Sequence, residues 1–168
     1  AVEYCDCSED KAEETMEALL KEDDNIQVVC TTSDSMAVGA QRAIAELGRD
    51  DIHIVSFDGM IDVSELVRVG EIDAVFAQDP YEMGKQCIDY AVKKCNGEEV
   101  EDSVYTDVTL ITSGNAEAHI SELQRQLGLA QEPDTPLTAI VSRLVGHKGM
   151  DLVCQGLGGI MATGCQLV

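Results

Sequence analysis

Basic residues are scarce in this sequence compared with acidic ones. The 168 residues include 11 Lys and Arg against 32 Asp and Glu, which gives a formal net charge of -21. Such an acidic surface repels nucleic-acid phosphates and anionic lipid head groups. We therefore expect no nucleic-acid partner and no binding to a membrane surface. The plainest interpretation of the charge is a solvated outer face.

Long apolar runs are absent as well. No stretch approaches the roughly 20 apolar residues that span a bilayer, and no basic segment followed by an apolar one marks a secretory signal. We therefore expect no membrane insertion. Residues 1–4 have the character of the middle of a strand, and residues 165–168 that of a strand just beginning. We expect that both ends are cut from longer domains.

Paired cysteine motifs are also missing, although the chain has seven Cys. None has the CxxC spacing of a zinc or redox site, and an odd number argues against a fully paired disulfide framework. A metal site at Cys5 and Cys7 is the less favoured interpretation, and we expect neither a metal nor a cofactor. Cys30 and Cys87 lie in apolar patterns and are expected to be small core residues.

Short apolar strands alternate with amphipathic helices along the chain. Strands are expected at residues 2–5, 26–30, 52–57, 72–77 and 104–111, and helices at 12–20, 36–47, 63–69, 80–95 and 115–127. Each parallel crossover needs a helix to return the chain. The order therefore predicts an α/β fold, a three-layer parallel-type sheet flanked by helices.

Three polar loops directly follow expected strands: 31–34, 58–59 and 78–80. In parallel sheets, ligands bind beyond the C-terminal ends of the strands. The pattern alone predicts a polar site at this edge, without identifying its ligand. Two plainer interpretations stay open. Asp58-Gly59 is a strong turn dipeptide, and Gln78 could simply precede a helix whose N-cap is Asp79.

Three segments resemble the C-terminal lobe of type I periplasmic sugar-binding proteins, over about residues 1–113. They are VVCTTSDSMAVGAQRAIAELG, IHIVSFDGM and EIDAVFAQDPYEMGKQCIDYAVKKCNGEEV, in family order and spacing. The resemblance implies half of a cleft for a small sugar, contacted by Ser33, Asp58 and Gln78. Ser33 stands where ribose-type members often carry Asn. A sugar hydroxyl donates and accepts hydrogen bonds, which a carboxylate and an amide can satisfy.

Transcription regulators of the lactose-repressor type share this lobe. Their DNA-binding helix-turn-helix is not found in this sequence. The residues of the SFDG and AQDPYEMG segments also resemble those of the transport proteins more than those of the regulators. The regulator interpretation therefore ranks lower.

The end of the chain has a different character. Residues 1–113 carry 27 acidic and 8 basic residues, whereas the remaining 55 carry 5 and 3. The segment ELQRQLGLAQEPDTPLTAIVSRLVGHKGMDLVCQGL resembles the start of the nucleotide-binding domain of bacterial glycogen (starch) synthases. The apolar spacing and two prolines predict a helix and linker at 114–136, followed by a strand–helix–strand at 137–168. The resemblance implies that this last part is a partial Rossmann-like βαβ unit of a nucleotide-binding domain. It places Arg143 and Lys148 on the diphosphate of ADP-glucose; without it, both are ordinary solvated cations.

No catalytic residue is expected, because a synthase also needs an acceptor domain and further strands that this sequence lacks. The leading hypothesis is a monosaccharide-recognition module of an ABC-type solute-binding protein, truncated and weak alone. The alternatives are an inactive fragment of an ADP-glucose-dependent glucosyltransferase and a recombinant chain with no function. The sequence does not fix the location: a sugar-binding parent would be extracytoplasmic, and a synthase parent cytoplasmic.

Truncation predicts exposed apolar surface, because each piece was selected to pack against elements that are missing. We expect the tail strand at 138–141 to dock against the larger piece. The alternatives are a disordered tail and a homo-oligomer that forms through exposed apolar faces.

Overall fold

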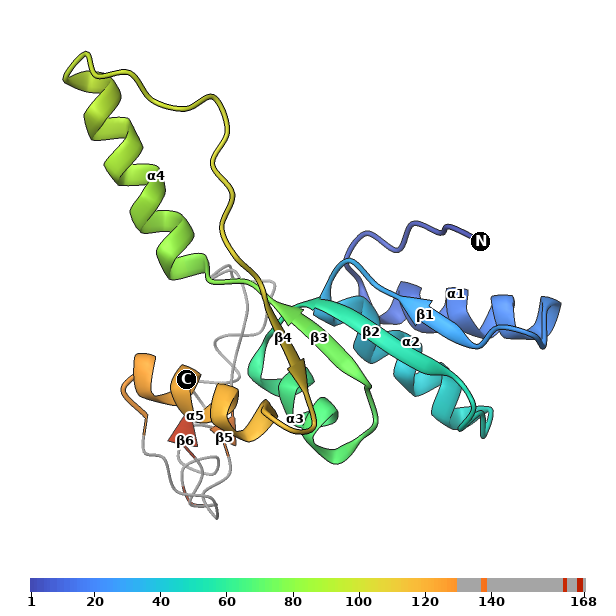
Figure 1. Cartoon of the computed structure of the whole chain (residues 1–168). Coiled ribbons are helices and arrows are strands. Elements are labelled where there is room, and N and C mark those ends of the chain that lie inside the picture. Colours follow the sequence, from blue (N-terminus) through green and yellow to red (C-terminus); the bar gives the residue numbers. More distant parts are fainter. Residues whose placement is uncertain (130–136, 139–161, 163–165, 168) are drawn as a thin grey trace. The chain divides into compact units, whose positions relative to one another are not determined.

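The computed structural model describes residues 1–129, 137–138, 162 and 166–167 (Figure 1). The chain divides into two compact units, Ala1–Ile120 and Ser121–Val168, and each is described by itself. The domain limits that the sequence suggests near residues 113 and 136 stay predictions.

The first unit is built on a four-stranded sheet with the order β1-β2-β3-β4. Strands β1 (Val28–Cys30), β2 (His53–Asp58) and β3 (Ala74–Ala77) are parallel, whereas β4 (Thr109–Thr112) is antiparallel to β3. The last strand thus differs from the expected parallel arrangement. The long connection at 96–108 lets the chain return along the sheet edge in the opposite direction, and such antiparallel edge strands are common on parallel sheets.

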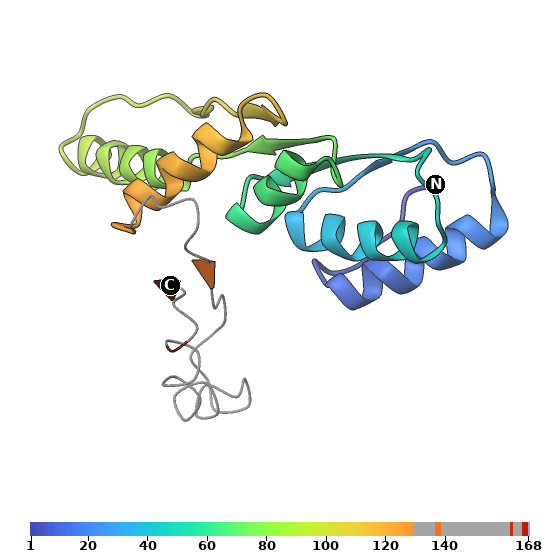
Figure 2. The same ribbon diagram turned by 90° about the horizontal axis from the view of Figure 1, so that it is seen from below.

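The expected helices are present. They are α1 (Glu9–Glu22), α2 (Asp34–Glu46), α3 (Ile61–Val69), α4 (Pro80–Cys95) and α5 (Ala116–Gln126). Helix α1 packs on α2, α2 packs on β2, and α3 packs on β3 and β4. Figure 2 shows α1, α2 and α3 on the same side of the strands.

The core lies between this face of the sheet and the helices. Alternate strand residues such as Ile54, Val75 and Ile111 are buried, because successive side chains of a strand point to opposite faces. On the opposite face, Phe76 and Leu110 are register partners and both are exposed. The predicted α/β class with a helix-flanked sheet is confirmed, and the described helices α1–α3 cover one of its two faces.

Some local predictions were wrong. Residues 2–5 form no strand, and Val2 and Tyr4 are exposed. Cys30 and Cys87 are exposed rather than in the core. Cys30 lies on the edge strand β1, and Cys87 lies on α4, a helix with no buried residue.

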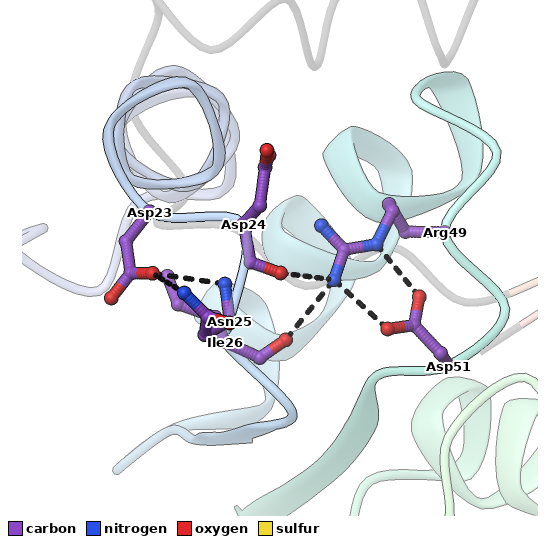
Figure 3. Close-up of polar contacts among 6 residues, drawn as sticks. All are labelled: Asp23, Asp24, Asn25, Ile26, Arg49 and Asp51. Carbon is purple, nitrogen blue, oxygen red and sulfur yellow. Dashed lines mark hydrogen bonds and ion pairs between the residues drawn. The ribbon is translucent and has the colours of Figure 1, made fainter.

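Arg49 joins two loops at the amino-terminal end of the strands (Figure 3). Its guanidinium holds the carboxylate of Asp51 through two bonds, Nε to Oδ1 at 2.7 Å and Nη2 to Oδ2 at 2.9 Å. Nη2 also donates to the backbone carbonyls of Asp24 and Ile26, at 3.1 and 3.3 Å. This cluster fixes where β1 and β2 begin, at the end of the sheet opposite to the predicted polar site.

The second unit contains one described strand pair. Strand β5 (Leu137–Thr138) runs parallel to β6 (Gln166–Leu167). A βαβ unit requires such a pair, and the expected Rossmann-like unit stays a prediction. Arg143, Lys148 and residues 139–141 lie outside the described residues. Within the described part of the chain, no helix has the length and apolar character needed to cross a membrane.

Candidate functional site

Two of the three predicted site residues meet at the carboxyl ends of β2 and β3. Asp58 is the last residue of β2, and Gln78 directly follows β3. The two strands are parallel neighbours in which Asp58 pairs with Ala77. Gln78, the residue after Ala77, therefore lies beside Asp58. Gln78 Nε2 donates to Asp58 Oδ1 at 2.7 Å, and the Gln78 N–H donates to the Asp58 carbonyl at 2.9 Å. Both residues are half-buried, so part of each stays open to a ligand.

Asp58 has an unusual backbone conformation, with φ at 136°. For a residue with a Cβ, this costs about 1–3 kcal/mol and persists only where the surroundings enforce it. Gly59 follows at φ 85°, close against β3: a Cβ here would overlap Ala77. Asp58-Gly59 therefore does form a tight turn, as the plainer interpretation expected. The same turn also directs the Asp58 carboxylate toward Gln78.

Ser33 lies at the start of α2, next to the same carboxylate. It is the N-cap residue, but its side chain makes no capping bond, and the backbone N–H of Asp34 donates to Asp58 Oδ2 at 3.4 Å. Ser33 is 8% exposed, and its Oγ is covered and has no hydrogen-bond partner in the described structure. A hydroxyl in this state gains free energy if a partner reaches it. Its predicted contact with a ligand stays a prediction.

Asp34 belongs to the predicted polar loop 31–34, but the sequence assigns it no role of its own in the site. Its carboxylate is buried and accepts three hydrogen bonds, from Ser56 Oγ at 2.6 Å and from the N–H groups of Gly59 and Met60 at 2.9 and 2.7 Å. Burial raises the pKa of the Asp34 carboxyl; repulsion from Asp58 adds to this effect, while the three hydrogen bonds oppose it. The available signal was an acidic residue in the first turn of a helix that follows a buried strand.

His119 also contacts the turn and was missed. Its Nε2 lies 3.1 Å from the carbonyl oxygen of Gly59. It comes from α5, whose apolar spacing assigns this residue no role. The pattern of α5 gives no signal for it, because the contact spans 60 positions of sequence.

The arrangement is suited to binding hydroxyl groups. Asp58 offers free lone pairs on a carboxylate oriented by Gln78, and an amide both donates and accepts. Among residues 1–129, no group of three or more His, Cys, Asp and Glu is arranged to hold a metal ion. A hollow of about 360 Å³ lies elsewhere, along α1, and is lined by Glu3, Glu14, Thr15, Ala18, Leu19 and Glu22. The strand-end residues form an open edge and do not line that hollow.

A model of the periplasmic binding protein domain matches residues 1–99, which include all three strand-end loops. The chain belongs to this family. This periplasmic binding protein domain is 32% identical, over 111 residues, to the ribose import binding protein RbsB of Salmonella typhimurium, with 66% of the chain and 38% of that protein aligned. Among solved structures, it resembles the periplasmic component of the arabinose ABC transporter from Shewanella sp. ANA-3, bound to L-arabinofuranose. That likeness has a TM-score of 0.64 and 28% identity, and covers 72% of this chain and 42% of the other. The chain thus spans about two fifths of the length of these relatives.

The C-terminal part of the chain has a separate relative. The glycogen synthase of Paramagnetospirillum magneticum is 58% identical over 45 residues, which are 27% of this chain and 9% of that enzyme. The predicted resemblance of both parts of the sequence is therefore confirmed.

Proposed function

We propose that this chain is a monosaccharide-recognition module of an ABC-type solute-binding protein, with half of a sugar cleft that binds weakly alone. The observation that carries the proposal is the hydrogen-bonded pair of Asp58 and Gln78 at adjacent strand ends. The carboxylate accepts hydrogen bonds from sugar hydroxyls, while the amide fixes its orientation and offers a further polar contact. Relatives named for ribose import and arabinose transport support a sugar as the ligand class.

Weak binding follows from the share of the relatives that the chain spans. Ligand pockets bury most of the ligand surface between convergent groups. A single open edge desolvates one side of the sugar, so fewer hydrogen bonds are protected from water. We expect dissociation constants for ribose and arabinose in the millimolar range, about −4 kcal/mol.

Isothermal titration with D-ribose, L-arabinose and ADP-glucose tests this proposal. Asp58→Asn should weaken sugar binding by at least about tenfold, because the carboxylate's charge-assisted hydrogen bonds are lost. Asp62→Asn is the matched control, since Asp62 lies on α3 and, among residues 1–129, its carboxylate accepts a hydrogen bond only from the Val63 N–H. Equal ribose affinity in Asp58→Asn and the unchanged chain would reject the assigned role.

A second candidate function is a fragment of an ADP-glucose-dependent glucosyltransferase. The observation in its favour is the separate match of the C-terminal part to glycogen synthase. Arg143 and Lys148 would then bind the diphosphate of ADP-glucose. We propose that the fragment is inactive as it stands, because 9% of the enzyme's length cannot surround a transition state.

A further inference from the structure

The carboxylate of Asp34 forms its hydrogen bonds with the end of β2 and with the turn that follows it. Oδ2 accepts the N–H groups of Gly59 and Met60, the two residues directly after Asp58, and Oδ1 accepts Ser56 Oγ from inside β2. The residue is 1% exposed. Among the ion pairs of residues 1–129, none includes Asp34. A buried carboxylate without a paired cation is a poor way to gain stability, which suggests that it serves another purpose.

That purpose is indicated by the backbone of Asp58. Asp58 and Gly59 both have positive φ, at 136° and 85°, and in this turn the Asp58 carboxylate meets both Gln78 and the Asp34 N–H. Such a conformation has to be imposed by its neighbours. The Asp34 carboxylate accepts hydrogen bonds from the N–H groups of Gly59 and Met60, which directly follow Asp58. The backbone N–H of Asp34 also donates to the Asp58 carboxylate.

We propose that Asp34 is the positioning residue that holds the sugar-binding carboxylate of Asp58 in its working orientation. Asp34 does not touch the ligand, because it is buried beneath the turn. The inference rests on the proposed role of Asp58 in binding sugar. It adds a residue whose effect on binding is transmitted through the backbone of the turn.

Two substitutions separate positioning from bulk stability. In Asp34→Asn, the amide oxygen can still accept both N–H groups, and the new NH₂ can donate to Ser56 Oγ, so the turn should hold. In Asp34→Ala, all three acceptor contacts are lost. Ser64→Ala is the control, because Ser64 is equally buried in α3, and its Oγ has no hydrogen-bond partner in the described structure.

Amide hydrogen exchange of the full chain measures the turn without any sugar. In Asp34→Ala, exchange at Gly59 and Met60 should be at least about tenfold faster, while Ala43 in α2 keeps its protection. Asp34→Asn and Ser64→Ala should match the unchanged chain at all three amides. Unchanged protection of Gly59 and Met60 in Asp34→Ala would overturn the proposal. Equal acceleration at Ala43 would also overturn it, because it would show a general structural role.

Titration of the same variants with D-ribose provides the second arm. Asp34→Ala should lose about tenfold in affinity and Asp34→Asn less than about threefold. Full ribose affinity in Asp34→Ala would overturn the positioning role and leave the proposed function intact. If the unchanged chain binds no sugar, the proposed function fails, whereas the exchange measurement still judges the Asp34–turn contact.

A further variant covers the case in which Asp34→Ala does not fold. Ser56 Oγ donates to Asp34 Oδ1 and accepts from Thr31 Oγ1, so Ser56→Ala removes one of the three hydrogen bonds that hold the Asp34 carboxylate without adding volume beside the turn. Faster exchange at Gly59 and weaker ribose binding are expected. Normal exchange at Gly59 with full ribose affinity would count against the proposal.

Discussion

At the scale of single residues, the strand-end site depends on a turn in which side-chain volume is forbidden. Gly59 combines a positive φ with close contact to β3, where an added Cβ would lie 2.6 Å from Ala77 Cα and overlap its Cβ. Gly70, the C-cap residue of α3, has almost the same φ of 84° but nothing within 4 Å of an added Cβ. The pair therefore separates backbone strain from steric overlap.

We predict that Gly59→Ala is more destabilising than Gly70→Ala. Gly70→Ala should cost about 1–2 kcal/mol of unfolding free energy from the left-handed backbone alone. Gly59→Ala adds overlap with Ala77 and should cost about 1–3 kcal/mol more. Urea unfolding of the two variants provides the measurement. Equal losses of unfolding free energy would show that β3 can move away from the added Cβ at no energetic cost.

We expect the contribution of Asp34 to the free energy of unfolding to change with pH in the opposite direction from that of Asp51. Burial raises the pKa of Asp34 in the folded chain, so the folded state holds this proton more tightly than the unfolded state. The contribution of Asp34 to stability is therefore greatest below its unfolded pKa and falls as pH rises toward the folded pKa. Hydrogen bonding from Arg49 lowers the pKa of Asp51, whose contribution is present above its unfolded pKa and is lost as pH falls.

Unfolding free energies of Asp34→Asn and Asp51→Asn, measured from about pH 3 to pH 7, test these signs. Relative to the unchanged chain, Asp34→Asn should gain stability as pH rises, and Asp51→Asn should lose it. If the difference in unfolding free energy between Asp34→Asn and the unchanged chain did not vary with pH, the folded chain would not perturb the pKa of this carboxyl.

The sequence could identify Asp58 and Gln78 because both directly follow apolar strands, and strand ends converge in a parallel sheet. It could not identify Asp34 or His119 as parts of the same turn. Both act on backbone groups of Gly59, and a bond to the backbone leaves no pattern of side-chain types to recognise. Asp34 belongs to the predicted polar loop 31–34, but its residue type alone does not show that its carboxylate turns inward to the backbone of Gly59.

At the scale of elements, the contact between α1 and α2 depends on another glycine. Gly39 lies inside α2, where an added Cβ would overlap the backbone oxygen of Glu9 and touch Ala12. The close approach allows Arg42 of α2 to bond Glu9 of α1 at 2.8 Å. Because α2 also carries Asp34, this packing helps to place the site.

Gly39→Ala should therefore lower stability by about 1–3 kcal/mol, since α1 must move away from α2. Gly84→Ala in α4 is the matched control: its added Cβ meets nothing, and the change should favour the helix by up to about 1 kcal/mol. Thermal unfolding followed by circular dichroism compares the two. Unchanged stability of Gly39→Ala would contradict this prediction, because it would show that α1 and α2 can separate without a loss of unfolding free energy.

Element order was predictable, whereas pairing and exposed faces were less so. Helices α1 to α4 follow from apolar spacing and caps, including Asp79, whose carboxylate accepts the Glu82 N–H at 2.8 Å as predicted. The segment at 104–111 alternates along its length, yet only 109–112 pairs, because β3 is short. In α5, Ala116 and Ile120 are buried, whereas Ala118 is exposed, and the range predicted for this helix does not show which of its faces is covered. The alternation does not reveal which partner an element meets.

At the scale of the whole molecule, the chain joins two units with different relatives. The first belongs to the periplasmic binding protein domain family, and the C-terminal part matches glycogen synthase. The two resemblances predict different ligands, so each can be tested in the same chain.

No glucosyl transfer from ADP-glucose to glycogen should be detectable, because the C-terminal match covers a small part of the enzyme. Release of ADP measures the reaction, and Arg143→Ala is the diagnostic variant. Turnover that disappears in Arg143→Ala would establish the synthase fragment as active and contradict this expectation.

The central claim is that a sugar binds at the strand ends, and chemical-shift mapping tests it most directly. In a titration of the ¹⁵N-labelled chain with D-ribose, we predict saturable shifts at residues 31–34, 58–60 and 78–80, including the Gln78 side-chain amide. Amides along α1, such as those of Glu14 and Leu19, should stay unmoved and report on the separate hollow. Shifts confined to α1, or no saturable shift at the strand ends at millimolar ribose, would contradict the account.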